Sequence, residues 1–256
     1  MKRFFAIILA SWCLVAAGCG STEPQPDPDS GSGDSVFAKG ADVSWLTQME
    51  KEGCKFYDAS GNETECMALL KSLGMNTIRL RVWVNPSGGW CGRQDVLVKA
   101  RRAKALGMRL MIDFHYSDSW ADPGKQNKPA AWKNLDFDGL VNALASHTAE
   151  VLGALKAEGI TPEWVQIGNE TNGILAGEKT WFNIQYLMQA GAKAVREIYP
   201  EALVAVHFAN PENGDAYLDY AWRLNYYSVD YDVFASSYYP YWHGSTENLT
   251  KVLTDI

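Results

Sequence analysis

An Asn-Glu pair is the feature of this sequence best suited to chemistry. Asn169 and Glu170 follow directly on a short apolar segment, residues 164–168. A carboxyl group that apolar walls partly dehydrate has a raised pKa and can act as a general acid near neutral pH. Asn169 has the donor and the acceptor needed to hold a hydroxyl group. A Glu after a strand is, taken alone, more often a helix-start or surface residue, so the interpretation depends on its surroundings.

Other polar side chains stand at the ends of similar apolar segments. They are Arg81, His115, His207 and Tyr238. Three of them have a structural alternative: Arg81 as an ion-pair partner, and His115 and His207 as hydrogen-bonded residues at strand ends. His147 falls in the middle of a helical segment and is interpreted as structural. Together, the strand-end residues favour a polar site built where several strands terminate.

Aromatic residues gather in the same connecting segments. Aromatic faces stack on the apolar C–H faces of sugar rings, and few basic residues accompany these side chains. The pattern is typical of a site for a neutral polysaccharide. The residues are Trp45, Trp83, Trp90, Trp120, Trp132, Tyr239, Tyr241 and Trp242.

The elements that must position these residues alternate between strand and helix. A Gly after the helical segments, as at Gly74, Gly107 and Gly159, is typical of a helix C-cap. Repeated β–α units with apolar strands predict a parallel sheet covered by helices, and we expect a (β/α)8 barrel, whose site lies at the carboxyl ends of the strands. The expected strands are residues 37–44, 76–83, 109–116, 163–168, 203–208 and 231–238; the expected helices are 62–73, 95–106, 137–158, 180–199 and 212–226.

Charge and missing motifs exclude several function classes. The formal net charge is −7, so the chain lacks the basic field that attracts nucleic acid. No GxGxxG or GxxxxGK[ST] motif is present, which argues against a nucleotide cofactor. The four His residues show no HxH or HExxH spacing, which argues against metal catalysis. GxSxG is also absent, which argues against a serine hydrolase.

Four motifs, in order along the chain, resemble those of glycoside hydrolase family 53, the endo-β-1,4-galactanases. They are residues 74–86 (GMNTIRLRVWVNP), 113–126 (DFHYSDSWADPGKQ), 166–173 (QIGNETNG) and 236–244 (SSYYPYWHG). The third-strand motif, 113–126, is the most specific. The resemblance implies a (β/α)8 barrel that cleaves β-1,4-galactan, such as the galactan side chains of pectin, with retention of configuration and without a cofactor.

The resemblance also implies roles for single residues. Glu170 is the implied general acid/base, and Asn169 would bind the sugar 2-hydroxyl at the cleavage point. Arg81 and Tyr238 would contact and orient the nucleophile. Other residues would line the site or shape sugar subsites. These are His115, His207, Trp83, Trp120, Asp122 and Trp242.

The nucleophile itself is not expected within this sequence. In the family it is a Glu that ends the seventh strand, whereas six strands are found here, followed by a helical segment at 247–256. A barrel typically takes about 250 residues. We therefore expect a C-terminally truncated galactanase with about the first six βα units, and a calcium site in the missing part stays open. The loop 88–92 departs from the family by its Cys. Two alternatives remain: another glycosidase of mannanase or xylanase type, and a surface lipoprotein that only binds glycan.

The first 35 residues are predicted to be targeting segments and not part of the folded domain. Residues 1–18 combine a basic start with a short apolar run, as in a signal peptide. Small residues before Cys19 resemble a bacterial lipobox; a plain secretory signal is the alternative. Residues 19–35 are polar and predict a flexible tether, with the catalytic barrel at 36–256. We expect a monomer anchored by lipid to the outer membrane or cell surface of a Gram-negative bacterium.

Three cysteines follow the tether. Cys54, Cys66 and Cys91 lack CxxC spacing, which argues against a zinc site. Export favours disulfides. Cys54–Cys66 would close the shortest loop and is the preferred pair.

Overall fold

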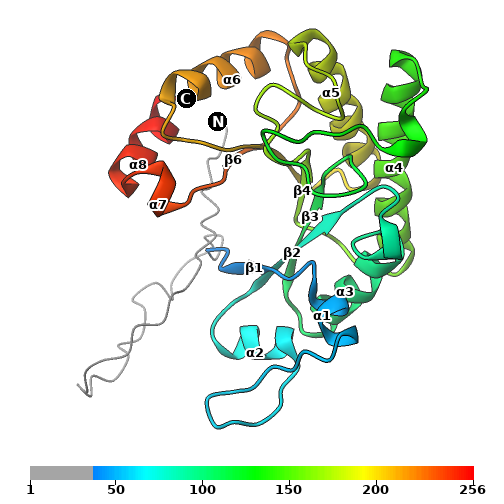
Figure 1. The fold of residues 1–256 in the computed structure, drawn as a ribbon, viewed down its shortest axis with the longest axis vertical. Coiled ribbons are helices and arrows are strands. Elements are labelled where there is room, and N and C mark those ends of the chain that lie inside the picture. Colours follow the sequence, from blue (N-terminus) through cyan, green and yellow to red (C-terminus); the bar gives the residue numbers. More distant parts are fainter. Residues whose placement is uncertain (1–36) are drawn as a thin grey trace.

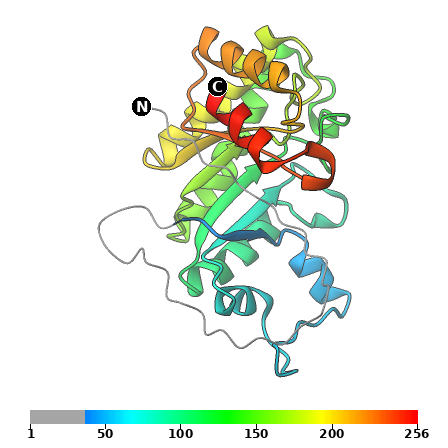
Figure 2. The same cartoon turned by 90° about the vertical axis from the view of Figure 1, so that its left-hand side faces the viewer.

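A computed structural model describes residues 37–256. The predicted signal peptide, Cys19 and the tether lie outside the described residues. The fold is a single six-stranded parallel sheet with strand order β1-β2-β3-β4-β5-β6. The sheet curves into part of a barrel, with helices outside it (Figures 1 and 2). Its strands are β1 (Gly40–Asp42), β2 (Thr77–Val82), β3 (Arg109–Phe114), β4 (Trp164–Ile167), β5 (Leu203–Phe208) and β6 (Val233–Ser236).

Helices connect successive strands, which gives the repeated β–α order expected of a (β/α)8-type fold. Two short 3-10 turns, Ser87–Gly89 and Ala130–Trp132, lie in the loops after β2 and β3. No helix among residues 37–256 is long and apolar enough to cross a membrane. The helices are α1 (Leu46–Lys51), α2 (Cys66–Ser72), α3 (Arg93–Ala105), α4 (Phe137–Ala157), α5 (Trp181–Ile198), α6 (Gly214–Tyr226), α7 (Pro240–His243) and α8 (Thr246–Asp255).

Alternation along the strands divides the core into two parts. One face of each strand packs on the helices and belongs to a large apolar cluster; Ile78, Ile112 and Val165 are examples, each with no exposed surface. The opposite face points into the barrel, where a small second cluster includes Met111 and Trp164. Successive side chains of a strand point to opposite faces. The inward positions that follow toward the carboxyl ends are polar, and they build the site described below.

The sequence predicted all six strands and the main helices, with boundary differences. The helix expected from Asn62 begins instead at Cys66, because the Glu65 side chain accepts the Ala68 N–H and acts as the N-cap. Helices α1 and α7 were not predicted. Gly74, Gly107 and Gly159 do adopt positive φ after their helices, which confirms the C-cap interpretation.

The expected Cys54–Cys66 disulfide is wrong for this structure. Both residues, like Cys91, are free thiols. Cys54 is exposed after α1, whereas Cys66 is buried at the start of α2. Loop length alone did not reveal that the two side chains lie in different environments.

Candidate active site

A buried ion cluster forms the floor of the site. Arg79, on β2, donates through Nη1 to Asp42 Oδ2 at 2.7 Å, and its Nη2 lies 2.8 Å from Asp113 Oδ2. Asp113 is fully buried, and Arg79 is nearly so. The opposite charge keeps the pKa of Asp113 below its ordinary value despite burial, which acts the other way. The cluster therefore holds two carboxylates and one guanidinium at the barrel centre.

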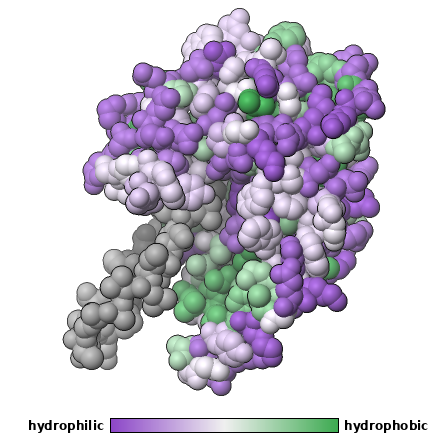
Figure 3. All heavy atoms as spheres, viewed as in Figure 1, coloured by the Kyte–Doolittle hydropathy of each residue, from purple (hydrophilic) through white to green (hydrophobic). Residues whose placement is uncertain are grey.

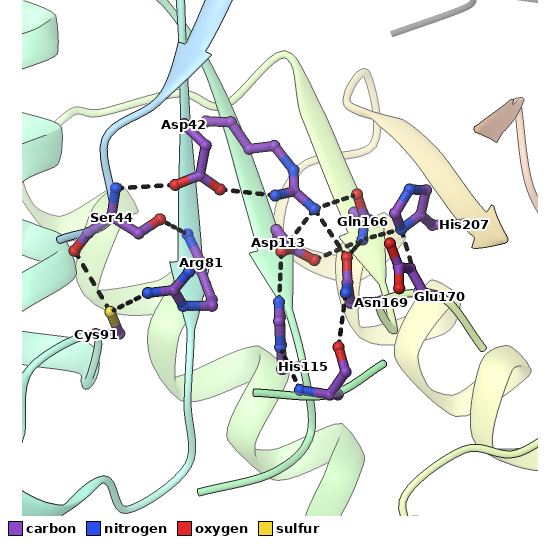
Figure 4. A network of polar contacts seen from close by, with 12 residues as sticks. Asp42, Ser44, Arg81, Cys91, Asp113, His115, Gln166, Asn169, Glu170 and His207 are labelled. Atoms are coloured by element: carbon purple, nitrogen blue, oxygen red, sulfur yellow. Dashed lines mark hydrogen bonds and ion pairs between the residues drawn. The ribbon is translucent and has the colours of Figure 1, made fainter. Parts of the chain in front are cut away.

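An amide pair extends this cluster toward Glu170. Gln166, on β4, donates through Nε2 to Asp113 Oδ1 at 2.6 Å, and its Oε1 accepts from Arg79. Asn169 Oδ1 also accepts from Arg79, at 3.0 Å, while Asn169 Nδ2 donates to the Ala121 carbonyl at 2.8 Å. An amide nitrogen carries two hydrogens, so Asn169 keeps one for a ligand. Figure 4 shows Asp113 of β3, Gln166 of β4 and Asn169 of the turn after β4 converging on one another.

His115 has a defined tautomer and no contact with solvent. Its Nδ1 accepts the Ala121 N–H at 3.0 Å, so Nε2 carries the hydrogen that bonds Asp113 Oδ2 at 2.9 Å. The ring is fully buried. His115 therefore ties the loop after β3 to the ion cluster, and the structure places it beneath the surface of the site.

Glu170 is fixed through its backbone. Its φ is +48°, a left-handed conformation uncommon for a non-glycine residue. The Glu170 N–H donates to His207 Nδ1 at 3.1 Å, and its carbonyl accepts from Gln126 Nε2. Gly168 begins this turn: its φ is +93°, and a Cβ there would lie 2.6 Å from the Thr171 side chain. The turn after β4 thus requires its glycine.

The Glu170 carboxyl is half-buried, and burial raises its pKa above the ordinary glutamate value. The nearby Asp122 carboxylate acts in the same direction, and a hydrogen bond from Ser237 Oγ to Glu170 Oε1, 2.6 Å long, opposes it. His207, beneath it, stays neutral because burial lowers its pKa to about 3. The neutral His207 imidazole adds no positive charge beside Glu170, so burial remains the largest influence on the pKa of this carboxyl.

A cavity of about 490 Å³ opens above these groups and has two unlike parts. One part is lined by Glu170, Asn169, His207, Trp45 and Trp120. The other is apolar, lies beside β1, α1 and α2, and is visible as a hydrophobic hollow in Figure 3. This apolar part is lined by Val43, Leu46, Met49, Phe56, Cys66 and Leu70.

Arg81 lies one inward position beyond Arg79, in an aromatic setting. Its guanidinium carbon is 3.8 Å from the Trp120 ring centre and 4.6 Å from that of Trp83. Its Nη2 bonds Cys91 Sγ at 3.3 Å, and its Nε has no partner among the described residues. None of the described carboxylates forms a salt bridge with it. Figure 4 shows Arg81 beside Cys91, apart from the Asp113–Asn169 group.

The other predicted site residues are spread around the mouth. Trp83 is buried and its indole N–H has no partner within residues 37–256. Asp122 is half-buried in the loop after β3. Tyr238 is buried, and its hydroxyl donates to the Gly244 carbonyl at 2.6 Å. Trp242 is 71% exposed on α7.

Sequence reasoning missed Asp42, Arg79, Asp113, Gln166 and Ser237. Four of them lay inside or next to quoted motifs without a role. The available signal was strand alternation: Arg79 and Arg81 are two residues apart on β2 and so share its inward face. The depth of each inward side chain in the barrel becomes clear only from the register with β3, in which Arg79 lies opposite Met111 and Arg81 lies opposite Asp113. No group of three His, Cys, Asp or Glu residues suited to a metal ion occurs in the described part of the chain.

Comparison with known proteins identifies the family of this chain. Residues 38–256 match the model of glycosyl hydrolase family 53. Over 225 residues the chain is 44% identical to an endo-β-1,4-galactanase of Bacillus subtilis, covering 85% of this chain and 52% of that protein. The chain thus spans about half the length of this relative.

Solved structures of the same family are also similar to this chain. The family 53 catalytic domain of Ignisphaera aggregans is 37% identical, with a TM-score of 0.79, over 84% of this chain and 63% of that one. A fungal β-1,4-galactanase is 30% identical, with a TM-score of 0.81, over 86% of this chain and 70% of that one. The chain, with its parallel strands and its Asn169–Glu170 turn, belongs to glycosyl hydrolase family 53.

Proposed function

We propose that the protein is a retaining endo-β-1,4-galactanase that cleaves galactan or arabinogalactan. The observation that carries this proposal is the Glu170 carboxyl, whose pKa is raised by burial and which faces a cavity walled by Trp45 and Trp120. Family membership and the galactanase names of the relatives support the choice of polymer. No observation favours mannan or xylan.

In the first chemical step, protonated Glu170 gives its proton to the glycosidic oxygen as the bond to the anomeric carbon breaks. A second carboxylate, about 5 Å from the first in retaining enzymes, attacks that carbon. In the second step, ionised Glu170 takes a proton from water, which then hydrolyses the glycosyl-enzyme. The free hydrogen on Asn169 Nδ2 is suited to the sugar 2-hydroxyl.

The second carboxylate is proposed to come from the end of a seventh strand; residues 37–256 contain six. Arg81 still has an unpartnered Nε–H and can donate to such a carboxylate. Tyr238 can do so only if its hydroxyl leaves the Gly244 carbonyl. Of the two proposed orienting residues, Arg81 is therefore the one that can donate to the second carboxylate without first breaking a hydrogen bond.

The test is an assay of the full-length protein on β-1,4-galactan, β-mannan and xylan, with a binding measurement on each polymer. We expect cleavage of galactan at least a hundred-fold faster than of the other two. Faster cleavage of mannan or xylan would contradict the substrate. Binding of galactan without cleavage would support the glycan-binding alternative.

We also propose that Cys19 is lipidated and anchors a monomeric enzyme to the envelope of a Gram-negative bacterium. The support is the small-residue run before Cys19 and the polar segment after it. Cys19→Ala should move the protein from the membrane fraction to the soluble fraction. Membrane retention of that variant would contradict the proposal, as would an unmodified Cys19 in the wild-type protein.

A further inference from the structure

Ser237 lies directly after β6, in the loop that faces Glu170. Its backbone N–H donates to the Phe208 carbonyl at 2.9 Å, which extends the pairing of β6 with β5 by one residue. Val233 and Ala235 point into the barrel, so alternation places Ser237 inward and Ser236 outward. Ser236 Oγ accordingly meets Tyr217 Oη of α6, at 2.6 Å. The two adjacent serines are equally buried and face opposite sides of the sheet.

The direction of each hydrogen bond around Ser237 is determined. His207 Nδ1 accepts the Glu170 backbone N–H. Because the ring is neutral, its single hydrogen is on Nε2, 3.1 Å from Ser237 Oγ. The serine oxygen therefore accepts from His207, and its own hydrogen is directed to Glu170 Oε1, 2.6 Å away. One imidazole thus fixes the backbone of Glu170 directly and its side chain through Ser237.

This arrangement distinguishes the two carboxyl oxygens of Glu170. If Oε1 carried the proton, the serine hydroxyl would lose its acceptor and leave a buried O–H without a partner, which is costly. If Oε2 carries it, every bond in the His207–Ser237–Glu170 chain is kept. We propose that Ser237 is a positioning residue that holds Glu170 Oε1 as the hydrogen-bond acceptor and so reserves Oε2 as the oxygen that delivers the proton.

The proposal rests on the proposed function for its kinetic consequences. The Ser237 hydroxyl stabilises the ionised carboxylate, so its removal raises the pKa of Glu170 further. The acid form then survives to higher pH. In Ser237→Ala the basic limb of kcat/KM should move up by about one pH unit, which is the size expected for one hydrogen bond to a charged group. Loss of orientation should lower kcat on galactan about ten-fold, with KM within about two-fold, as expected when an interaction made only in the transition state is lost.

Two further variants separate positioning from packing. Ser236→Ala removes the same atom from an equally buried neighbour that does not contact Glu170. It should leave the basic limb where it is. Ser237→Thr keeps the hydroxyl and should restore most of the wild-type profile. For Ser237→Ala, the loss should be smaller on an aryl β-galactoside, because a phenol leaving group needs little protonation.

A direct titration does not depend on turnover. The ¹³C resonance of the Glu170 carboxyl in the full-length protein, assigned by its disappearance in Glu170→Gln, should titrate at higher pH in Ser237→Ala than in wild type or Ser236→Ala. If the protein fails to cleave galactan, the proposed function fails while this titration still decides the role of Ser237. An unchanged or lowered pKa of Glu170 in Ser237→Ala would overturn the proposal, and so would an equal shift in Ser236→Ala.

Discussion

The two arginines of β2 mark two regions of the barrel mouth that differ in how many of their polar groups have hydrogen-bond partners. Around Arg79, the donors and acceptors of Asp113, Gln166 and Asn169 bond to one another and to Arg79. Around Arg81, two residues further on, the neighbours are Trp rings, and the Arg81 Nε and the Trp83 indole N–H have no partner among the described residues. The lower region is preorganised by its own contacts, whereas the upper one has polar groups and aromatic faces left for a ligand or a further part of the barrel.

Glu170 lies at the boundary between these regions, which explains its environment. Its backbone is bonded to the lower region through His207, while its carboxyl faces the cavity. Preorganised neighbours that cost nothing to arrange at the moment of reaction are the usual source of enzymatic rate enhancement. The comparison therefore predicts different kinds of loss for substitutions on the two sides.

The largest effect is expected at the boundary. Without a general acid the sugar oxygen must leave as an alkoxide, and general acid–base catalysis contributes about 10²–10⁴-fold. Glu170→Ala in the full-length enzyme should lose at least that factor in kcat on galactan, and much less in the first step on an aryl β-galactoside. Burst kinetics on the aryl substrate measure that step. Equal losses on both substrates would show that Glu170 is not the acid of the first step.

A pH effect on stability is expected at His147. His147, in α4, packs against the rings of Phe114, Tyr116 and Trp132, and burial lowers its pKa to about 4. The unfolded chain then binds more protons between about pH 4 and 6.5, so the free energy of unfolding falls as pH drops through that range.

The size of this effect is on the order of 2–3 kcal/mol. In His147→Leu, the difference in unfolding free energy between pH 7 and pH 4 should shrink by about that amount, as urea titrations at the two pH values would show. A variant with the pH dependence of wild type would mean that the pKa of His147 does not differ between the folded and the unfolded chain.

A smaller effect is expected on the aromatic wall. Trp120 is 42% exposed, lines the cavity and stacks over Arg81. Loss of one aromatic contact costs about 0.5–1.5 kcal/mol, so Trp120→Ala should raise KM for galactan roughly 2- to 12-fold with kcat little changed. Trp222→Ala, at an exposed tryptophan on α6 outside the cavity lining, is the control. A fall in kcat with unchanged KM would place Trp120 in the chemical step instead.

The sequence predicted the features that depend on local pattern. Strand alternation, glycines after helices and the position of Glu170 at a strand end were all readable from periodicity and spacing. The layer in which a side chain lies could not be predicted. Arg79 and Arg81 share one face of β2, and only the tertiary structure places Arg79 against Asp42 and Asp113 and Arg81 against Trp120. Ser237 was equally hidden, since its role depends on the tautomer of His207, a residue from another strand. The Cys54–Cys66 prediction failed for a similar reason: loop length does not report burial.

The most direct test of the two-region account compares Arg79→Met with Arg81→Met in the full-length protein, by urea denaturation and galactan kinetics. Arg79→Met leaves buried Asp113 without its guanidinium, and breaking such a pair costs about 3–5 kcal/mol. Arg81→Met leaves no described carboxylate unpaired and removes mainly cation–π contacts, a loss of about 1–2 kcal/mol. We predict that Arg79→Met is less stable than Arg81→Met by about 1–4 kcal/mol, and that Arg81→Met stays folded and shows weakened galactan hydrolysis. Equal destabilisation by the two substitutions, or wild-type galactan kinetics in Arg81→Met, would contradict it.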